Sequence, residues 1–303
     1  MSTTAGAATM ALVGMVFSLQ SPLNRGLGRA TGQVPAAFVN FAVGLLFVLV
    51  ACLLAGQLDG VTRIGPDWWH ALGGCMAAAY VLVGVVVVGR IGASGVAAGA
   101  LTGQLLCSIA VDSNGWLGVS QRPFEWRVAL GGAAVLLGTY MVVGLGRAGP
   151  EANGSRPPVD NLVPLVAMAL AGALLGIQIP LNGLLAESTG DFASGLINFL
   201  TGGAVLAVAL LVTGSARGLA GVRRVRWIYL GGGFCGALNA VAALALVDRL
   251  GAGTIAAATV TGQMVASLAI DRAGLFGLEP RRLDPARLFG AGLLVVGTIV
   301  VAR

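Results

Sequence analysis

The sequence predicts an all-α integral membrane protein in which ten transmembrane helices form two inverted five-helix repeats. Two observations predict this class. The 303-residue chain is 57% hydrophobic and only 10% charged, whereas a soluble domain carries about 25% charged residues. The bilayer must therefore replace water around most of the surface. The same ordered motifs also occur twice along the chain, which is the sign of an internal duplication.

The duplication is clearest in two blocks of sequence. Gln20–Gly44 shares 10 of 25 positions with Gln178–Gly202, and Val88–Val119 shares 14 of 32 with Val247–Leu278. The offset is 158 residues in the first block and 159 in the second. Two halves that share motifs in the same order are expected to share a fold.

Each apolar stretch that is long enough to cross the hydrocarbon core, about 20 residues, predicts one helix. In the first half these stretches cover residues 7–27, 34–56, 69–89, 93–111 and 128–146. In the second half they cover residues 162–186, 192–213, 227–247, 252–270 and 287–302. A segment rich in Pro, Gly and charge separates the halves and predicts a linker. The predicted domains are therefore 1–146 and 162–303, with the linker at 147–161.

An odd number of helices in each half requires the two halves to lie in opposite orientations in the membrane. The basic side chains, all of them Arg, test this arrangement. Thirteen fall on one predicted side of the membrane and five on the other. Because basic residues concentrate on the cytoplasmic side, both termini are predicted to lie outside.

Composition also excludes several classes of function. The sequence pI near 9.9 does not indicate nucleic-acid binding, because the arginines lie between apolar stretches rather than on one continuous stripe. His70 is the only histidine, and the four cysteines have no CxxC spacing, so no metal or cofactor is expected. The absence of a Ser/His/Asp set argues against an enzyme. The expected partners are the lipid bilayer and a small-molecule substrate.

The first helix of each half carries two carboxamides with a proline between them. Side chains four residues apart share one face of a helix, and the proline removes a backbone hydrogen bond and kinks the helix. These residues are Gln20, Pro22 and Asn24 in the first half, and Gln178, Pro180 and Asn182 in the second. A kinked helix with polar side chains near mid-membrane is how such folds build a substrate site.

Four further carboxamides are repeated in later helices: Asn40, Gln104, Asn198 and Gln263. If the helices converge, the eight carboxamides form one uncharged substrate site near mid-membrane. Because carboxamides both donate and accept hydrogen bonds, such a site suits amides, hydroxyls, zwitterions or delocalised cations. The alternative is that they form interhelical hydrogen bonds that only hold the bundle together.

Two acids are also repeated, each just past the fourth helix of its half. Asp112 lies eight residues after Gln104, and Asp271 lies eight residues after Gln263. They are candidates for gating or proton relay. The alternative is that each caps its helix or pairs with a nearby Arg.

The paired Gln-x-Pro-x-Asn and Asn-Phe elements, the later Thr-Gly-Gln and the following Asp resemble the YdcZ-like family of the drug/metabolite transporter superfamily. Members of that family often consist of one five-helix half, and this chain is similar to two halves fused. The resemblance implies a ten-helix inverted-repeat fold and an exporter of the bacterial inner membrane. The related small multidrug-resistance proteins carry a Glu in the first helix, where this chain has Gln20 and Gln178. That difference argues against simple proton antiport.

These observations together predict a secondary transporter for small organic solutes that works by alternating access at the repeat interface. Two alternatives remain open: a passive channel or facilitator on the same scaffold, and a membrane assembly subunit that does not transport. Because the fusion supplies both halves, one chain is expected to be sufficient, with a homodimer as the alternative.

Overall fold

The part of the chain that the structure describes is mostly helical and contains no strand. The computed structural model describes residues 3–118, 121, 125–143 and 161–302, so most of the predicted linker lies outside the described residues. The helices are α1 (Thr3–Phe17), α2 (Gln20–Thr31), α3 (Gln33–Leu54), α4 (Gly73–Asn114), α5 (Trp126–Val143), α6 (Leu162–Thr189), α7 (Asp191–Val212), α8 (Gly231–Ala273) and α9 (Pro285–Ala302). Their ends fall within a few residues of most predicted boundaries.

Eight helical segments of the described chain are long and apolar enough to cross a membrane. They are Thr3–Thr31, Gln33–Leu54, Trp68–Asn114, Trp126–Val143, Leu162–Thr189, Asp191–Val212, Trp227–Leu246 and Thr254–Ala273. A shorter apolar helix follows at Pro285–Val301. The all-α integral membrane class is thus confirmed.

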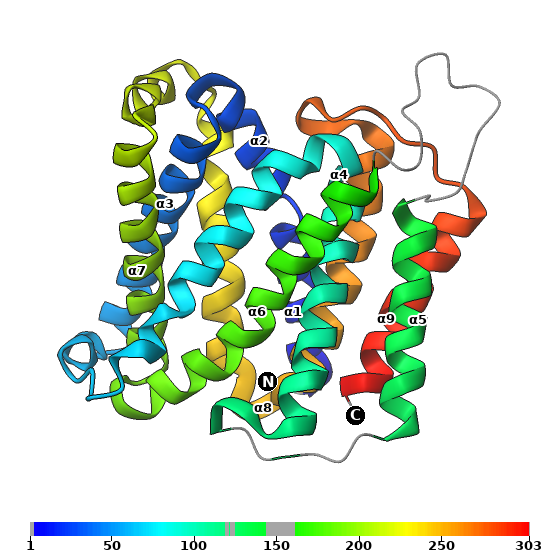
Figure 1. The fold of residues 1–303 in the computed structure, drawn as a ribbon, viewed down its shortest axis with the longest axis horizontal. Coiled ribbons are helices and arrows are strands. Elements are labelled where there is room, and N and C mark those ends of the chain that lie inside the picture. Colours follow the sequence, from blue (N-terminus) through cyan, green and yellow to red (C-terminus); the bar gives the residue numbers. More distant parts are fainter. Residues whose placement is uncertain (1–2, 119–120, 122–124, 144–160, 303) are drawn as a thin grey trace.

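The two longest helices are each interrupted at a glycine. Gly92 in α4 has φ 77° and ψ 174°, and Gly251 in α8 has φ 73° and ψ 153°. Only glycine adopts this backbone region without a steric penalty. In Figure 1 the chain reverses direction within α4, where the cyan part rises and the blue-green part returns. The two glycines lie 159 residues apart, so the repeat places one such reversal in each half.

The repeated proline of the Gln-x-Pro-x-Asn motif has a different helical context in each half. In the first half the helix ends at Phe17 and restarts at Gln20, which places Pro22 in the first turn of α2. Proline is tolerated there because first-turn N–H groups have no partner within the helix. In the second half Pro180 lies inside the unbroken helix α6. The duplicated motif therefore produces a break in one half and a continuous helix in the other.

The main helix–helix contacts join one half of the chain to the other. Helix α1 packs along α8, α6 along α4, α3 against α7, and α5 against α9. Helices approach closely at glycines: a Cβ added to Gly262 would lie 1.8 Å from the Ala11 carbonyl oxygen, and one on Gly103 would lie 1.7 Å from that of Ala169. Small residues permit this backbone contact, which drives helix association in lipid. Each of the four buried apolar clusters consequently contains residues from both halves.

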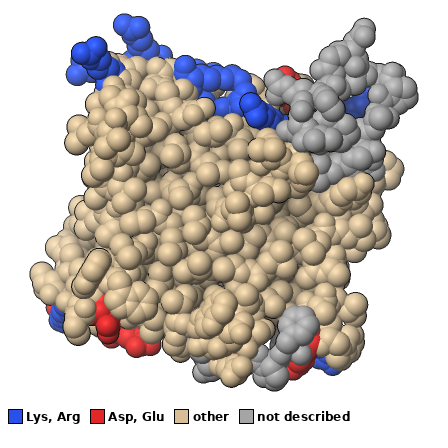
Figure 2. Space-filling model, viewed as in Figure 1, with Lys and Arg blue, Asp and Glu red and all other residues tan. Residues whose placement is uncertain are grey.

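Charged side chains lie at two opposite ends of the molecule. Figure 2 shows Arg side chains along the upper edge, a broad uncharged band below them, and a smaller group of acidic and basic side chains at the lower edge. Both chain termini lie at the lower edge in Figure 1. Helices α3 and α7 run in opposite directions, as do α5 and α9.

Candidate functional site

Three of the predicted carboxamides in the first half form one buried cluster. Gln20 Nε2 donates to Asn40 Oδ1 at 3.4 Å, and Asn40 Nδ2 donates to Asn24 Oδ1 at 2.9 Å. All three side chains are at most 6% exposed. We call Gln20, Asn24 and Asn40 the first carboxamide cluster. Its internal hydrogen bonds leave no acceptor oxygen of Asn24 or Asn40 unpaired.

A glycine face at the start of α8, which belongs to the other half of the chain, covers this cluster. A Cβ on Gly232 would lie 2.0 Å from Asn24 Oδ1, and a Cβ on Gly236 would lie 2.5 Å from Gln20 Nε2. Any larger residue at either position would displace the carboxamides. The sequence signal for this role is the Gly-x-x-x-Gly spacing, which places both glycines on one helix face.

The equivalent residues of the second half, Gln178, Asn182 and Asn198, meet the start of α4 in the same way. A Cβ on Gly73 would lie 2.6 Å from Asn182 Oδ1 and 3.3 Å from Gln178 Cγ. A Cβ on Gly74 would lie 2.1 Å from the Asn198 carbonyl oxygen. We call these three residues the second carboxamide cluster.

The second cluster lacks the hydrogen bonds of the first. Asn182 Oδ1 and Asn198 Oδ1 are buried and have no partner among the described residues. They are the repeat equivalents of Asn24 Oδ1 and Asn40 Oδ1, the two oxygens that are satisfied in the first cluster. The same three residue types therefore form a closed network in one half and an open one in the other.

One sequence difference fits this asymmetry. With the offset of 159 residues, Ala77 is the equivalent of Gly236. The first cluster requires glycine at that position, because a Cβ on Gly236 would lie 2.5 Å from Gln20 Nε2. The methyl group of Ala77 would crowd Gln178 if Gln178 took the position that Gln20 takes. The aligned halves reveal the Gly/Ala difference, and the structure reveals that this position lies beside the carboxamide.

The remaining predicted carboxamides belong to neither cluster. Gln104 and Gln263 are partly exposed, and the Gln104 backbone carbonyl faces Gly176 of α6. Asn239 of α8 has a buried Oδ1 without a partner in the described chain, although its repeat equivalent is not a carboxamide. The structure thus brings six of the eight predicted carboxamides into two groups of three, rather than eight into one.

Asp271, the second predicted acid, caps a helix from the other half. Its fully buried carboxylate accepts hydrogen bonds from the backbone N–H of Ala93 at 2.7 Å and of Ser94 at 3.0 Å. It also accepts one from the Ser94 hydroxyl. These N–H groups begin the part of α4 that follows Gly92, where a carboxylate complements the positive end of the helix dipole. A Cβ on Gly92 would lie 2.8 Å from Asp271 Oδ2.

Two arginines form further hydrogen bonds in the same region. Arg281 donates to the Arg90 carbonyl oxygen, and its own N–H donates to the Asp271 carbonyl oxygen at 2.8 Å. Burial lowers the pKa of Arg281, and the charge of Asp271 opposes that shift. Arg29 Nη2 of α2 donates to the Gly277 carbonyl oxygen at 2.7 Å. We call this set of contacts, centred on Asp271 and Gly92, the Asp271 clamp.

Among the described residues, the repeat-related end of the molecule shows no such clamp. A Cβ on Gly251, the equivalent of Gly92, would meet no described atom within 4 Å, while residues 119–120 and 122–124, the counterparts of 278–279 and 281–283, lie outside the described part of the chain. Asp112, the equivalent of Asp271, is partly exposed. The counterpart of Arg29 is Glu187, and the counterpart of Arg281 is Arg122, which lies outside the described residues. The two ends of the α4–α8 pair therefore differ in structure although their sequences are related.

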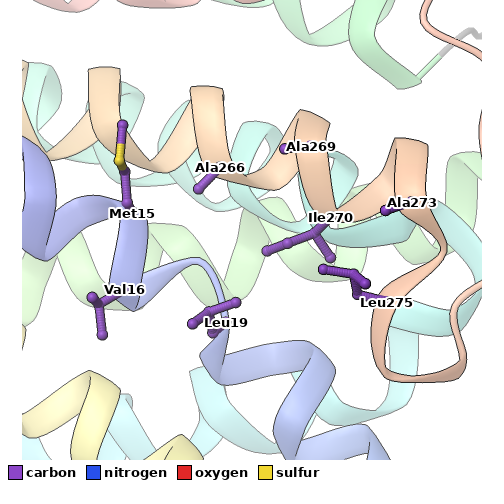
Figure 3. Close-up of a pocket in the computed structure, with 8 residues that line it drawn as sticks. All are labelled: Met15, Val16, Leu19, Ala266, Ala269, Ile270, Ala273 and Leu275. Atoms are coloured by element: carbon purple, nitrogen blue, oxygen red, sulfur yellow. The ribbon is translucent and has the colours of Figure 1, made fainter.

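An apolar groove of about 430 Å³ lies between α1 and the last turns of α8. Figure 3 shows its lining residues: Met15, Val16, Leu19, Ala266, Ala269, Ile270, Ala273 and Leu275. None of these side chains offers a hydrogen bond to a polar solute. Elsewhere, the described residues contain no group of three His, Cys, Asp or Glu side chains that could hold a metal ion.

Comparisons with known proteins agree with this architecture. A family model described as "Putative inner membrane exporter, YdcZ" matches the chain twice, over residues 5–141 and 163–300. A comparison with curated proteins finds no match. One solved structure, whose description reads "Crystal structure of protein", superposes on this chain with a TM-score of 0.59 and is 17% identical in sequence. The superposition covers 98% of this chain and 96% of the other, and at this identity it shows a shared fold alone.

Proposed function

Because the chain belongs to the YdcZ family of inner membrane exporters, we propose that it is a secondary transporter that exports small organic solutes by alternating access between two inverted repeats. The family model matches residues 5–141 and 163–300, which supports one family unit in each half. The proposed repeats are residues 1–146 and 162–303, and one chain supplies both.

The lengths of the helices support ten membrane crossings. A straight helix over Trp68–Asn114 would measure about 70 Å at 1.5 Å per residue, more than twice the thickness of a hydrocarbon core of about 30 Å. The reversal at Gly92 turns this segment into two crossings, and Gly251 does the same in α8. The opposite directions of α3 and α7 in Figure 1 favour an inverted repeat.

The single observation that carries alternating access is the difference between the two ends of the α4–α8 pair. Asp271 clamps the start of the second part of α4, whereas no described residue closes on Gly251 in the equivalent region. A symmetric scaffold that is closed at one end and open at the other is what a transporter requires in one of its two states. In the other state we expect Asp112 to take the role of Asp271.

The first and second carboxamide clusters are the proposed substrate-binding elements. Each joins two helices of one repeat to the first turn of a helix from the other, so a relative movement of the repeats changes both. Neither cluster contains a charged side chain, which fits an uncharged or delocalised solute better than a strong ion. We place the Arg-rich upper face of Figure 2 in the cytoplasm, which leaves both termini outside.

Distances between spin labels test alternating access without knowledge of the substrate. In a background without the four native cysteines, one label pair spans the Asp271 clamp (R90C with P280C). The equivalent pair spans the open end (R249C with Q121C), and L46C with L53C within α3 serves as the control. We expect a short, narrow distance at the clamp and a longer one at the open end.

The D271N substitution should then lengthen the clamp distance and shorten the distance at the open end, with the control unchanged. A reciprocal change of this kind is what alternating access demands. If D271N opens the clamp while the other end stays as it was, the two ends are independent, and a passive channel or an assembly subunit describes the protein better.

A further inference from the structure

The two unpaired oxygens of the second carboxamide cluster point to the chemistry of the solute. Asn198 is only 7% exposed, so bulk water has little access to its side chain. A buried carbonyl oxygen without a hydrogen bond is costly, and nearly all such groups in proteins have a partner. Here two of them, Asn182 Oδ1 and Asn198 Oδ1, lack one among the described residues.

The neighbouring protein groups do not supply the missing donors. The Thr201 hydroxyl, which lies beside Gly74, is already bonded to the carbonyl oxygen of Ala71 at 2.9 Å. Gln178, whose equivalent donates in the first cluster, does not donate to Asn198 Oδ1, and the second half has Ala77 where the first cluster meets Gly236. The two oxygens therefore lack donors only in the second half, since their equivalents in the first half are paired.

We propose that Asn182 and Asn198 accept hydrogen bonds from one nitrogen-bearing group of the transported solute: an amine, a primary amide or a guanidine. Both unpaired atoms are carbonyl oxygens, which accept hydrogen bonds and cannot donate them. A single hydroxyl has one hydrogen and satisfies one of them, whereas an NH2, NH3⁺ or guanidinium group can satisfy both. Carboxylates and ethers offer no donor. This assignment rests on the proposed transport function and narrows its substrate class.

Pairs of probes that differ only in their N–H groups test this assignment in the detergent-purified full chain. Methylammonium is compared with tetramethylammonium, guanidinium with its hexamethyl derivative, and acetamide with N,N-dimethylacetamide, with binding followed by thermal stability. We expect at least one N–H probe to bind and its methylated partner not to bind. The pair that responds identifies which nitrogen group the solute carries.

Substitutions then locate the binding site. N198L, which keeps the shape of the side chain and removes the acceptor, should weaken binding of that probe by about tenfold or more, the factor that 1.4 kcal/mol represents. N198D should strengthen binding of a cationic probe, because hydrogen bonds to an ionised acceptor are stronger. A77G should weaken binding, since it lets Gln178 close the cluster. N114D, the same change at an exposed helix end, is the control and should leave binding unchanged.

Several results would overturn the assignment: no N–H probe binds, methylated probes bind equally well, or N198L binds as the unmodified protein does. These outcomes leave the spin-label distances unaffected, so they are distinguishable from a failure of alternating access. Conversely, N–H binding that depends on Asn198 in a protein without reciprocal movement would retain the site and reject the transport cycle.

Discussion

Replacing the central asparagine of each carboxamide cluster by leucine is expected to have opposite consequences in the two halves. Asn40 forms two side-chain hydrogen bonds, with Gln20 and Asn24, whereas Asn198 Oδ1 has no partner among the described residues. Leucine has nearly the same shape as asparagine, so packing changes little. The comparison therefore isolates hydrogen bonding at two positions related by the repeat.

The magnitude follows from the contacts. Side-chain hydrogen bonds between membrane helices contribute about 0.6 kcal/mol each on average, so N40L loses about 1.2 kcal/mol directly. It also leaves the buried Asn24 Oδ1 unpaired, which costs about 1–3 kcal/mol more. The free energy of unfolding should fall by about 2–4 kcal/mol in N40L. In N198L it should stay within about 0.5 kcal/mol or rise, because an unsatisfied group is removed.

Reversible unfolding in mixed micelles, measured without any solute, gives both free energies. The decisive result is which of the two variants has the lower free energy of unfolding, because the detergent affects both variants alike. Equal losses in N40L and N198L would refute the reasoning, since they would mean that Asn198 is paired in the membrane as Asn40 is.

Three further predictions concern contacts elsewhere in the fold. D271N removes the negative charge at the start of the second part of α4 and should make S94C accessible to a membrane-impermeant thiol reagent; continued protection would argue against the clamp. G236A should destabilise the protein by about 1–3 kcal/mol, because its methyl group meets Gln20 and forces strain into the first cluster, as thermal unfolding would show. G262A should abolish the stable fold seen by size-exclusion chromatography, since its Cβ would lie 1.8 Å from a backbone oxygen, whereas G203A meets nothing within 4 Å and should be tolerated.

Much of the candidate site could be predicted because it depends on repetition. The offset between the halves identified Gln20, Asn24 and Asn40 with their counterparts, and the structure brings these six residues into two groups. It could not show that the groups are separate, because the distance between helices depends on how the repeats pack. Asp271 was predicted as either a gate or a cap. Its partners are the N–H groups of Ala93 and Ser94. They lie 177–178 residues away in the sequence, so the residues around Asp271 could not identify them.

The sequence by itself determined that the protein lies in a membrane, that its helices are long and apolar, and that it is built twice. Those properties follow from the apolar composition, from the length of each apolar stretch and from the repeated motifs, all of which can be read without knowing which helices are in contact. Only the tertiary structure decided which carboxamides are paired and which end of the molecule is clamped. These features depend on single atoms across interfaces between the halves: the first cluster closes because Gly236 has no Cβ to meet Gln20, and the Asp271 carboxylate reaches the N–H groups of Ala93 and Ser94.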